Sequence, residues 1–384
     1  MEFDEKGGIR PGLATSWTSD AAQTRWTFQL RGGVKLHDGS ALTPAAVANA
    51  LGPALSGRAI NTSGTELTIQ SVLPMPGLLY DLAHARASVA IRLPNGTLQG
   101  SGPFRAIEWT PGVKLAVAAF DGYWDGRPYL DGVEVRLGRA LRDQLSELEA
   151  GRADVIETTP AEFRRQELRG RRAWPGASAD LIALVHLRGR PAVQDARIRQ
   201  AVALAVDRGP IWNVLLQKQG ETTASLLPSW MTGFGFVFGI SRDLPRAKEL
   251  GSGQPAITLG HDPADWVLKS IAERIALNSR EASLTMRLAT GVDADTVLAR
   301  LSSTSVDPRI TLSDYCRQLK VQTPAGTGTI EGLYQAERRL LDGYWIVPLF
   351  HVPALYALQP RVRNWAAAGS LYWRLEEVWL EPAP

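Results

Sequence analysis

The sequence predicts a mixed α/β fold, and three stretches support that prediction. Residues 26–30 alternate polar and apolar side chains, which is typical of a strand with one buried face. Residues 141–150 place leucines at helical spacing, and Gly151 ends that pattern. Within 257–288 the pattern predicts a strand, a helix and a second strand, at 257–259, 266–277 and 284–288. A chain of 384 residues is long enough for two or three domains and a large core.

The amino-terminal third supplies a helix start and two turn signals. Thr43 and Pro44 predict a helix over 45–51, because threonine suits the N-cap and proline suits the first helical position. Pro111-Gly112 and Asp125-Gly126 predict turns, since glycine adopts positive φ without strain. The segments between these turns are apolar or alternating, so we expect strands there.

The remaining elements follow from local periodicity. Asp195 predicts the N-cap of a helix whose inward face carries Ile198, Ala201, Val202 and Ala205. Asp207 predicts the cap of the next helix, over 211–217. We also expect helices over 245–250 and 331–341, and strands over 181–187 and 346–350 and near 373–380.

Composition excludes several classes of protein. The chain carries 42 basic and 39 acidic residues, a net charge of +3 that is too small to predict nucleic-acid binding. Cys316 is the single cysteine, so no internal disulfide framework is expected, and we expect it to pack within a helix. The start of the chain has no signal-peptide pattern, and no run of about 18 apolar residues predicts a membrane helix.

The search for catalytic chemistry gives no candidate. A Gly-x-Ser-x-Gly elbow is absent, and the five histidines are scattered without a His-Glu-x-x-His pair. We therefore expect no catalytic residue, no metal site and no cofactor, and the pattern favours binding without chemistry.

Four motifs together resemble one family. They are Gly-Ser-Gly-Pro-Phe at 100–104, Tyr-Trp-Asp-Gly-Arg-Pro-Tyr-Leu-Asp at 123–131 and Pro-Gly-Leu-Ala-Thr-Ser-Trp at 11–17. The fourth is the helix sequence Asp-x-Arg-Ile-Arg-Gln-Ala-Val-x-x-Ala-Val-Asp-Arg at 195–208. This combination resembles the large periplasmic solute-binding proteins, family 5, of peptide, nickel and oligosaccharide importers. The resemblance covers most of the chain and thins over 291–330.

The resemblance implies an α/β, periplasmic-binding-protein-like fold (type II, cluster C-like). Two α/β lobes would be joined by a hinge and accompanied by a small extra α+β domain. That extra domain would span 9–100, lobe I would span 101–205 with 345–384, and lobe II would span 206–344. The hinge is expected near Val206 and Tyr344.

The implied function is that of the extracytoplasmic solute-binding component of an ABC importer, located in the periplasm or outside the cell. Such a protein captures a peptide-like or other small organic solute between its lobes and delivers it to a membrane permease. We expect a monomer that is not an enzyme. A solute-binding sensory or regulatory module, or a degenerate binder without a transport role, stays open as an alternative.

The resemblance also implies ligand contacts. The expected ligand-binding residues are Thr158, Thr159, His186, Arg188, Trp230, Phe234 and Phe236. A loose alignment puts Leu301 and Thr304 where peptide-binding members carry a tryptophan and an aspartate. The carboxylate that would hold a peptide's amino group is therefore missing from that position. We expect Tyr123-Trp124 and Pro128-Tyr129 to pack as framework, outside the binding site.

Overall fold

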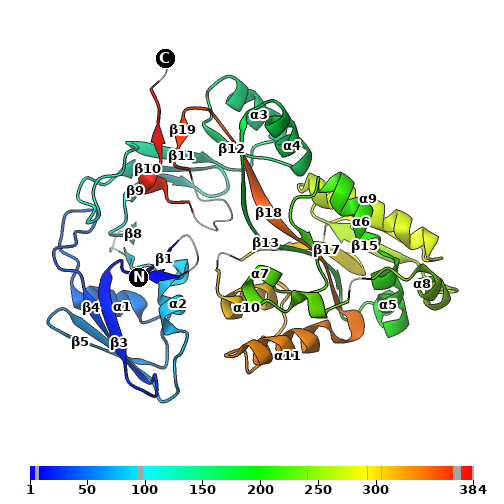
Figure 1. Cartoon of the computed structure of the whole chain (residues 1–384), viewed down its shortest axis with the longest axis horizontal. Helices are drawn as coiled ribbons and strands as arrows, with labels where there is room; N and C mark the ends of the chain where they lie inside the picture. Colours follow the sequence, from blue (N-terminus) through cyan, green and yellow to red (C-terminus); the bar gives the residue numbers. More distant parts are fainter. Residues whose placement is uncertain are drawn as a thin grey trace. The chain divides into compact units, whose positions relative to one another are not determined.

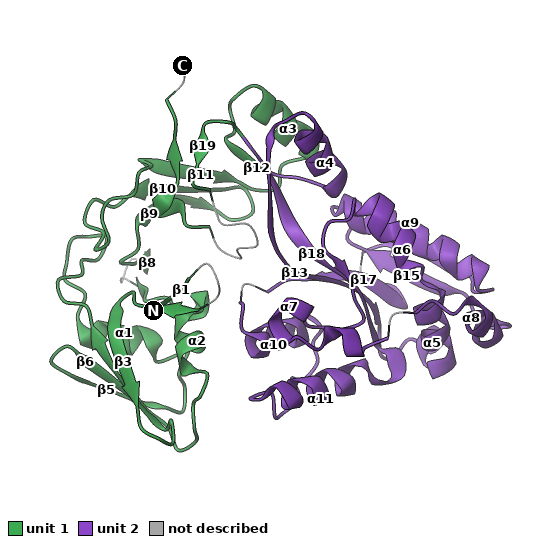
Figure 2. Ribbon diagram, viewed as in Figure 1, with its two compact units in different colours: residues 1–156, 359–384 green, residues 157–358 purple. Residues whose placement is uncertain are grey.

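The computed structural model describes residues 1–4, 8–92, 98–239, 241–291, 293–303, 305–365 and 373–382. The chain forms two compact units (Figure 2). Unit 1 comprises Met1–Ile156 and Gln359–Pro384, and unit 2 comprises Glu157–Leu358. Both contain helices and strands, which confirms the mixed α/β prediction. The units divide the chain at other places than the predicted lobes do, and the division into lobes stays a prediction.

A four-stranded antiparallel sheet forms the amino-terminal part of unit 1. Its order is β3 (Ala14–Ser19), β4 (Arg25–Leu30), β6 (Glu66–Gln70) and β5 (Ala59–Ser63). Trp26 and Phe28 point to the buried face, where α1 (Pro44–Leu51) and α2 (Leu78–Ala83) join the core. The predicted helix start is confirmed, because the Thr43 hydroxyl accepts a hydrogen bond from the amide of Ala46 at 3.2 Å.

A three-stranded antiparallel sheet follows, with the order β11 (Gly132–Arg136), β10 (Lys114–Ala119) and β9 (Phe104–Thr110). Gly112 turns between β9 and β10 with a φ of 73°. The Trp124 ring lies under the Arg31 guanidinium at 4.1 Å and 5.3 Å from the Tyr123 ring. This pair packs as expected. Tyr129 does not, since 71% of its surface is exposed.

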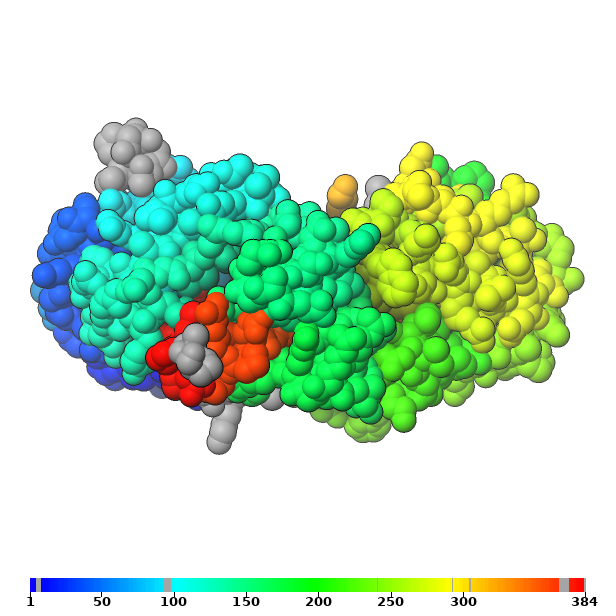
Figure 3. Space-filling view, turned by 90° about the horizontal axis from the view of Figure 1, so that it is seen from above, coloured from blue at the N-terminus to red at the C-terminus, as the bar shows by residue number. Residues whose placement is uncertain are grey.

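The other elements of unit 1 are short. They are β1 (Glu2–Phe3), β2 (Ile9–Arg10), η1 (Ala85–Ala87), β7 (Ile91–Arg92), β8 (Leu98–Gln99), α3 (Leu141–Glu149), β19 (Val362–Arg363), η6 (Leu375–Glu377) and β20 (Trp379–Leu380). The predicted strand near 373–380 is thus only β20, preceded by a 3-10 turn. This C-terminal segment, red in Figure 3, lies at the surface of unit 1.

Unit 2 is built on a mixed sheet with the order β12, β18, β13, β17, β15 and β16, and β14 pairs with β18. The strands are β12 (Val155–Glu157), β13 (Arg172–His186), β14 (Glu221–Thr222), β15 (Ile257–His261), β16 (Met286–Thr290), β17 (Thr296–Leu301) and β18 (Ile346–Leu358). The predicted strand–helix–strand unit is confirmed by the parallel pair of β15 and β16 around α9 (Trp266–Glu281).

Successive residues of β13 enter two different cores. Ile182 and Leu184 join the core that contains α8 (Leu244–Gly251) and α9, whereas Leu181 and Ala183 join the core of α10 (Pro308–Gln318) and α11 (Ile330–Leu341). Helices therefore cover both faces of the sheet (Figure 1). This explains why the strand is a continuous apolar run, without the polar alternation of a half-exposed strand.

The remaining helical elements of unit 2 are α4 (Pro160–Leu168), η2 (Pro191–Val193), α5 (Ala196–Ala205), α6 (Arg208–Pro210), the π-turn η3 (Ile211–Leu215), α7 (Ser229–Thr232), η4 (Gly235–Val237) and η5 (Asp342–Tyr344). Asp195 caps α5 as predicted, with its carboxylate accepting from the Arg197 amide. The helix predicted over 211–217 is present over Ile211–Leu215, but as a π-helix that follows α6. Asp207 makes no side-chain cap and instead pairs with Arg242 at 3.2 Å.

Two further expectations can be compared with the structure. Cys316 is buried in α10, as predicted. Among the described residues, no helix combines the length and the apolar character that crossing a membrane requires.

Candidate functional site

The paired strands β13 and β18 separate the predicted ligand residues of unit 2 into groups. The Thr158 amide donates to the Leu355 carbonyl at 2.8 Å, and Leu355 lies opposite Pro175 on β13. The His186 amide, at the far end of β13, donates to the Trp345 carbonyl. At about 3.3 Å per residue, these two points are roughly 35 Å apart along the strand. One small solute therefore does not contact both Thr158 and His186.

Charged side chains gather around Arg300 of β17. Its Nε lies 3.0 Å from Asp265 Oδ2, and its Nη1 lies 3.7 Å from Asp180 Oδ2. Asp265 also caps α9, since its other oxygen accepts from the amides of Val267 and Leu268. Glu157, the last residue of β12, interacts electrostatically with all three charged groups. We call Glu157, Asp180, Asp265 and Arg300 the acidic cluster.

The acidic cluster has too little positive charge for its carboxylates. Burial raises the pKa of Asp180 above its ordinary value, and the Arg300 guanidinium only partly opposes that rise. Burial likewise raises the pKa of Glu157, with Arg300 lowering it and the two aspartates adding to the rise. Three carboxylates face one guanidinium, so a further cation here would gain favourable charge interactions.

Trp230 lies beside β13, the strand that carries Asp180, and belongs to the short helix α7. Its Nε1 donates to the Ser178 carbonyl of β13 at 3.3 Å, and 49% of its surface is exposed. The Glu221 carboxylate holds the start of α7 by accepting from both the amide and the hydroxyl of Ser229. His351 Nδ1 lies 3.4 Å from that carboxylate and lowers its pKa. An indole face is thus held at a fixed position and open to solvent.

The two threonines have different roles. The Thr159 hydroxyl accepts from the Glu162 amide at 3.4 Å and so caps α4. The Thr158 hydroxyl is buried and has no hydrogen-bond partner among the described residues. Because Thr158 follows Glu157 directly, its hydroxyl is the better candidate for a ligand contact.

The phenylalanines lie in another setting. Phe234 packs against the core of α10 and α11, with its ring 5.6 Å from the Tyr334 ring. Phe236, in η4, is 83% exposed. Among the described residues, neither phenylalanine forms an aromatic pair with Trp230, and the Phe234 ring pairs instead with the rings of Tyr334 and Phe238.

His186 and Arg188 belong to a basic region at the carboxyl end of β13. His186 is buried, its Nδ1 lies 2.7 Å from the Thr296 hydroxyl, and burial together with Arg199 lowers its pKa to about 3. The imidazole is therefore neutral. The guanidinium groups of Arg188 and Arg199 each lie over the Trp345 ring, at 4.5 and 3.8 Å. Burial and the charge of Arg188 lower the pKa of Arg199. We call Arg188, Arg199 and Trp345 the guanidinium stack.

Three residues of the acidic cluster were missed by sequence reasoning. Asp265 carries a helix-cap signal, which explains it locally without a ligand. Asp180 and Arg300 lie in strands, and only the pairing of β13 with β17 brings them together. Leu301, aligned with the family's tryptophan, is buried in the core. Thr304 lies outside the described residues.

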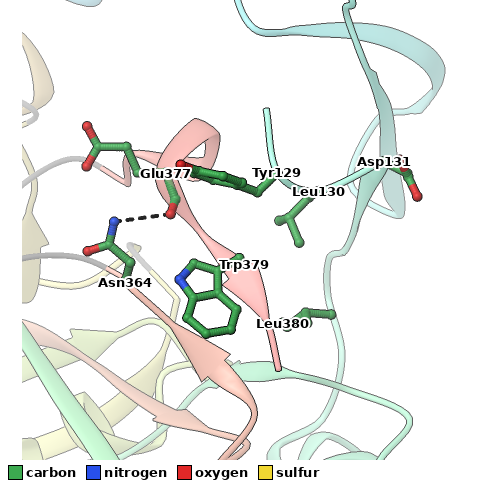
Figure 4. Close-up of a pocket in the computed structure, with 8 residues that line it drawn as sticks. Tyr129, Leu130, Asp131, Asn364, Glu377, Trp379 and Leu380 are labelled. Atoms are coloured by element: carbon green, nitrogen blue, oxygen red, sulfur yellow. Dashed lines mark hydrogen bonds between the residues drawn. The ribbon is translucent and has the colours of Figure 1, made fainter. Parts of the chain in front are cut away.

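Hollows occur within each unit. In unit 1, a cavity of about 470 Å³ is lined by residues from Met1 to Pro103, most of them apolar, and by Tyr123 and Trp124. A second, of about 690 Å³, lies between Tyr129 and Trp379 (Figure 4). There the Asn364 amide donates to the Glu377 carbonyl at 3.1 Å. Unit 2 has a cavity of about 890 Å³ beside α5 and α11. Within the described ranges, no three His, Cys, Asp or Glu side chains are grouped as metal ligands.

The sequence matches the family described as bacterial extracellular solute-binding proteins, family 5, over residues 8–251. The chain belongs to that family. It is 24% identical over 274 residues to a dipeptide-binding protein of Escherichia coli, covering 59% of this chain and 51% of that protein. The chain thus spans about half the length of the relatives that it matches.

Solved structures show the same fold. NikA from Staphylococcus aureus, in complex with Ni(L-His)2, superposes with a TM-score of 0.84 at 16% identity, over 99% of this chain and 93% of that one. DppA from Helicobacter pylori, in complex with the peptide STSA, gives a TM-score of 0.84 at 16% identity, over 99% and 91%. The predicted periplasmic-binding-protein-like fold is therefore confirmed.

Proposed function

We propose that this chain is the solute-binding component of an ABC importer and captures a peptide-like or other small organic solute that carries an amino group. The acidic cluster is the single observation that supports recognition of an amino group on the solute. Its carboxylates exceed its one guanidinium, and an ammonium ion would form charge-assisted hydrogen bonds with them. Family membership supports capture of a solute, and the similar proteins include a dipeptide-binding protein and a DppA bound to the peptide STSA.

Four side chains would share the recognition of the solute. Asp180 and Glu157 would accept from the ammonium group, and the buried Thr158 hydroxyl would supply a neutral hydrogen bond. The half-exposed indole of Trp230 would cover an apolar part of the solute. His186 would take no part as a cation, because its buried imidazole is neutral.

Calorimetry with the dipeptide Ala-Phe and with its N-acetyl form tests this role. We expect saturable binding of the free dipeptide and at least tenfold weaker binding of the acetylated form, since acetylation removes the positive charge. The double variant Asp180→Asn/Glu157→Gln is expected to lose at least tenfold in affinity. Glu273→Gln, an exposed position on α9, is the matched control and should bind as the wild type does.

Two results would contradict the proposal. One is equal affinity for the free and the acetylated dipeptide. The other is the absence of saturable binding for Ala-Phe and for a panel of small primary amines.

The wider role follows from the family. The chain would act outside the cytoplasm, in the periplasm or at the cell exterior, as a monomer that docks on a membrane permease. It would perform no catalysis. The predicted lobes would close around the solute by bending near Val206 and Tyr344. Small-angle scattering with and without Ala-Phe tests this closure, which should make the ligand-bound protein more compact.

A further inference from the structure

The charge that lines the cavity of about 890 Å³ in unit 2 is opposite in sign to that of the acidic cluster. Its described lining comes from α5, α6, η4, α11 and η5, and from the first residues of β18. None of the acidic-cluster residues is among that lining. The cavity is therefore a separate place at which a ligand could be recognised.

The lining is rich in positive charge. Arg208, Arg338 and Arg339 face a single carboxylate, Asp342, so the described lining has a formal charge of +2. Arg338 and Arg339 are exposed, and neither forms an ion pair with a described residue. Arg208 is buried, and its Nη2 donates to the Pro348 carbonyl at 2.8 Å. Burial lowers its pKa only to about 10, so it stays charged at neutral pH.

One wall of the cavity is aromatic. The ring of Tyr334 lies 5.5 Å from that of Phe238. The Phe234 ring packs edge-on against the Tyr334 ring. The Arg338 guanidinium lies 5.7 Å from the Tyr334 ring. A cation next to an aromatic face can hold an acidic group and a flat apolar body side by side.

The corner that begins β18 is held in an unusual backbone conformation. Tyr344, a lining residue, has a φ of 57°, next to Gly343 at 70°. The Arg199 Nε donates to the Gly343 carbonyl at 2.6 Å, and the Arg199 guanidinium stacks on Trp345. A bulky residue in the left-handed region is strained, and such positions concentrate at binding sites.

We propose that this cavity binds a small organic anion, in which a carboxylate, sulfonate or phosphate is attached to a flat or apolar body. The guanidinium groups of Arg338 and Arg339 pair with the anionic group at the mouth. The rings of Tyr334 and Phe238 cover the body, and Arg208 adds its charge from the buried side. This anion site is distinct from the amine recognition that we assign to the acidic cluster.

Calorimetry with naphthalene-2-sulfonate tests the site, and naphthalene-2-methanol is the neutral control of the same shape. We expect saturable binding of the sulfonate only, with an affinity that falls as sodium chloride is added. The double variant Arg338→Gln/Arg339→Gln should weaken binding at least tenfold while its circular dichroism and thermal unfolding stay those of the wild type. Arg280→Gln, an exposed arginine of α9 that does not line the cavity, should leave the affinity unchanged.

The opposite outcomes overturn the proposal. These are no saturable heat with the sulfonate, equal affinity for the alcohol, or full affinity in the double variant. The variant Asp180→Asn/Glu157→Gln separates the two sites. It should bind the sulfonate as the wild type does even if the dipeptide test fails, and loss of sulfonate binding there would place the anion elsewhere.

Discussion

Two regions along β13 and β18 of unit 2 have opposite electrostatic characters. Near Asp180, three carboxylates share one guanidinium, and burial raises the pKa of two of them. At the carboxyl end of β13, the Arg188 and Arg199 guanidinium groups share one indole ring, and burial lowers the pKa of Arg199. The first region has too few cationic groups for its carboxylates, and the second has no carboxylate in the stack to pair with its guanidinium groups. One region therefore suits a cation, and the cavity beside the other suits an anion.

The comparison also shows how each region tolerates its like charges. The acidic cluster spreads its carboxylates over two strands and a helix start. The guanidinium stack instead places both of its cations over one aromatic ring, and these cation–π contacts offset their repulsion. Removing the ring should therefore affect stability more than removing one carboxylate.

Trp345→Ala has the largest expected effect. Without the ring, two neighbouring like charges lose the cation–π contacts that they share, and a partly buried indole is lost. We expect a loss of about 2–3 kcal/mol in the free energy of unfolding, measured by urea denaturation. Trp345→Phe keeps an aromatic ring beside the guanidinium groups and should lose about 1 kcal/mol. Equal losses in the two variants would show that the stack contributes nothing beyond volume.

The same variants test whether the two regions are independent. Folded Trp345→Phe should bind Ala-Phe with unchanged affinity, because the acidic cluster shares no described contact with Trp345. A tenfold change in that affinity would contradict the separation of the two regions.

Glu337→Gln has an intermediate expected effect, and it concerns the helix that carries the basic residues of the cavity. The buried Glu337 carboxylate accepts from the Ser225 hydroxyl and from the amides of Leu226 and Leu227, and burial raises its pKa to about 7. A raised pKa stabilises the protonated folded state, so this contribution is complete below the ordinary value of 4.5 and is lost as the pH rises from there to about 7. The wild type should lose about 1 kcal/mol per pH unit between about pH 5 and about pH 7 relative to Glu337→Gln, and no more above about pH 8. Urea denaturation from about pH 4 to about pH 8 measures the difference.

Glu331→Gln, at the exposed start of the same helix, is the control and should follow the wild-type pH profile. Parallel profiles for the wild type and Glu337→Gln would contradict the assigned pKa.

The sequence predicted the parts of the fold that local patterns determine. The α1 start and the α5 cap follow from residues next to each helix, and both are confirmed. The strand predicted over 181–187 is longer in the structure, because β18 pairs with β13 back to Arg172 through irregular register near Pro175. Proline lowers the local preference for a strand, so only the long-range partner explains that extension.

The acidic cluster was less predictable from the sequence, because long-range strand pairing assembles it as well. Asp180, Asp265 and Arg300 come from three distant segments, and each has an ordinary local explanation. Their shared charge balance exists only after the sheet has formed. Thr159, predicted as a contact, caps α4, and a threonine before a proline serves that role whether or not a ligand is near, so its contact with a ligand stays a prediction.

Substitution of Tyr344 has the smallest expected effect. It tests whether the strained backbone at the start of β18 serves the anion cavity or the fold alone. Its φ of 57° is strained for any residue with a Cβ, and its side chain is 38% exposed, so the ring adds little to the core. Tyr344→Gly removes ring and strain together, whereas Tyr344→Ala removes the ring and keeps the strain. We expect the glycine variant to be more stable than the alanine variant by about 1 kcal/mol in urea denaturation. Both should bind naphthalene-2-sulfonate more weakly than the wild type, because the ring lines the cavity. If both bind it fully, the strained corner serves the fold alone and the anion makes its contacts without Tyr344.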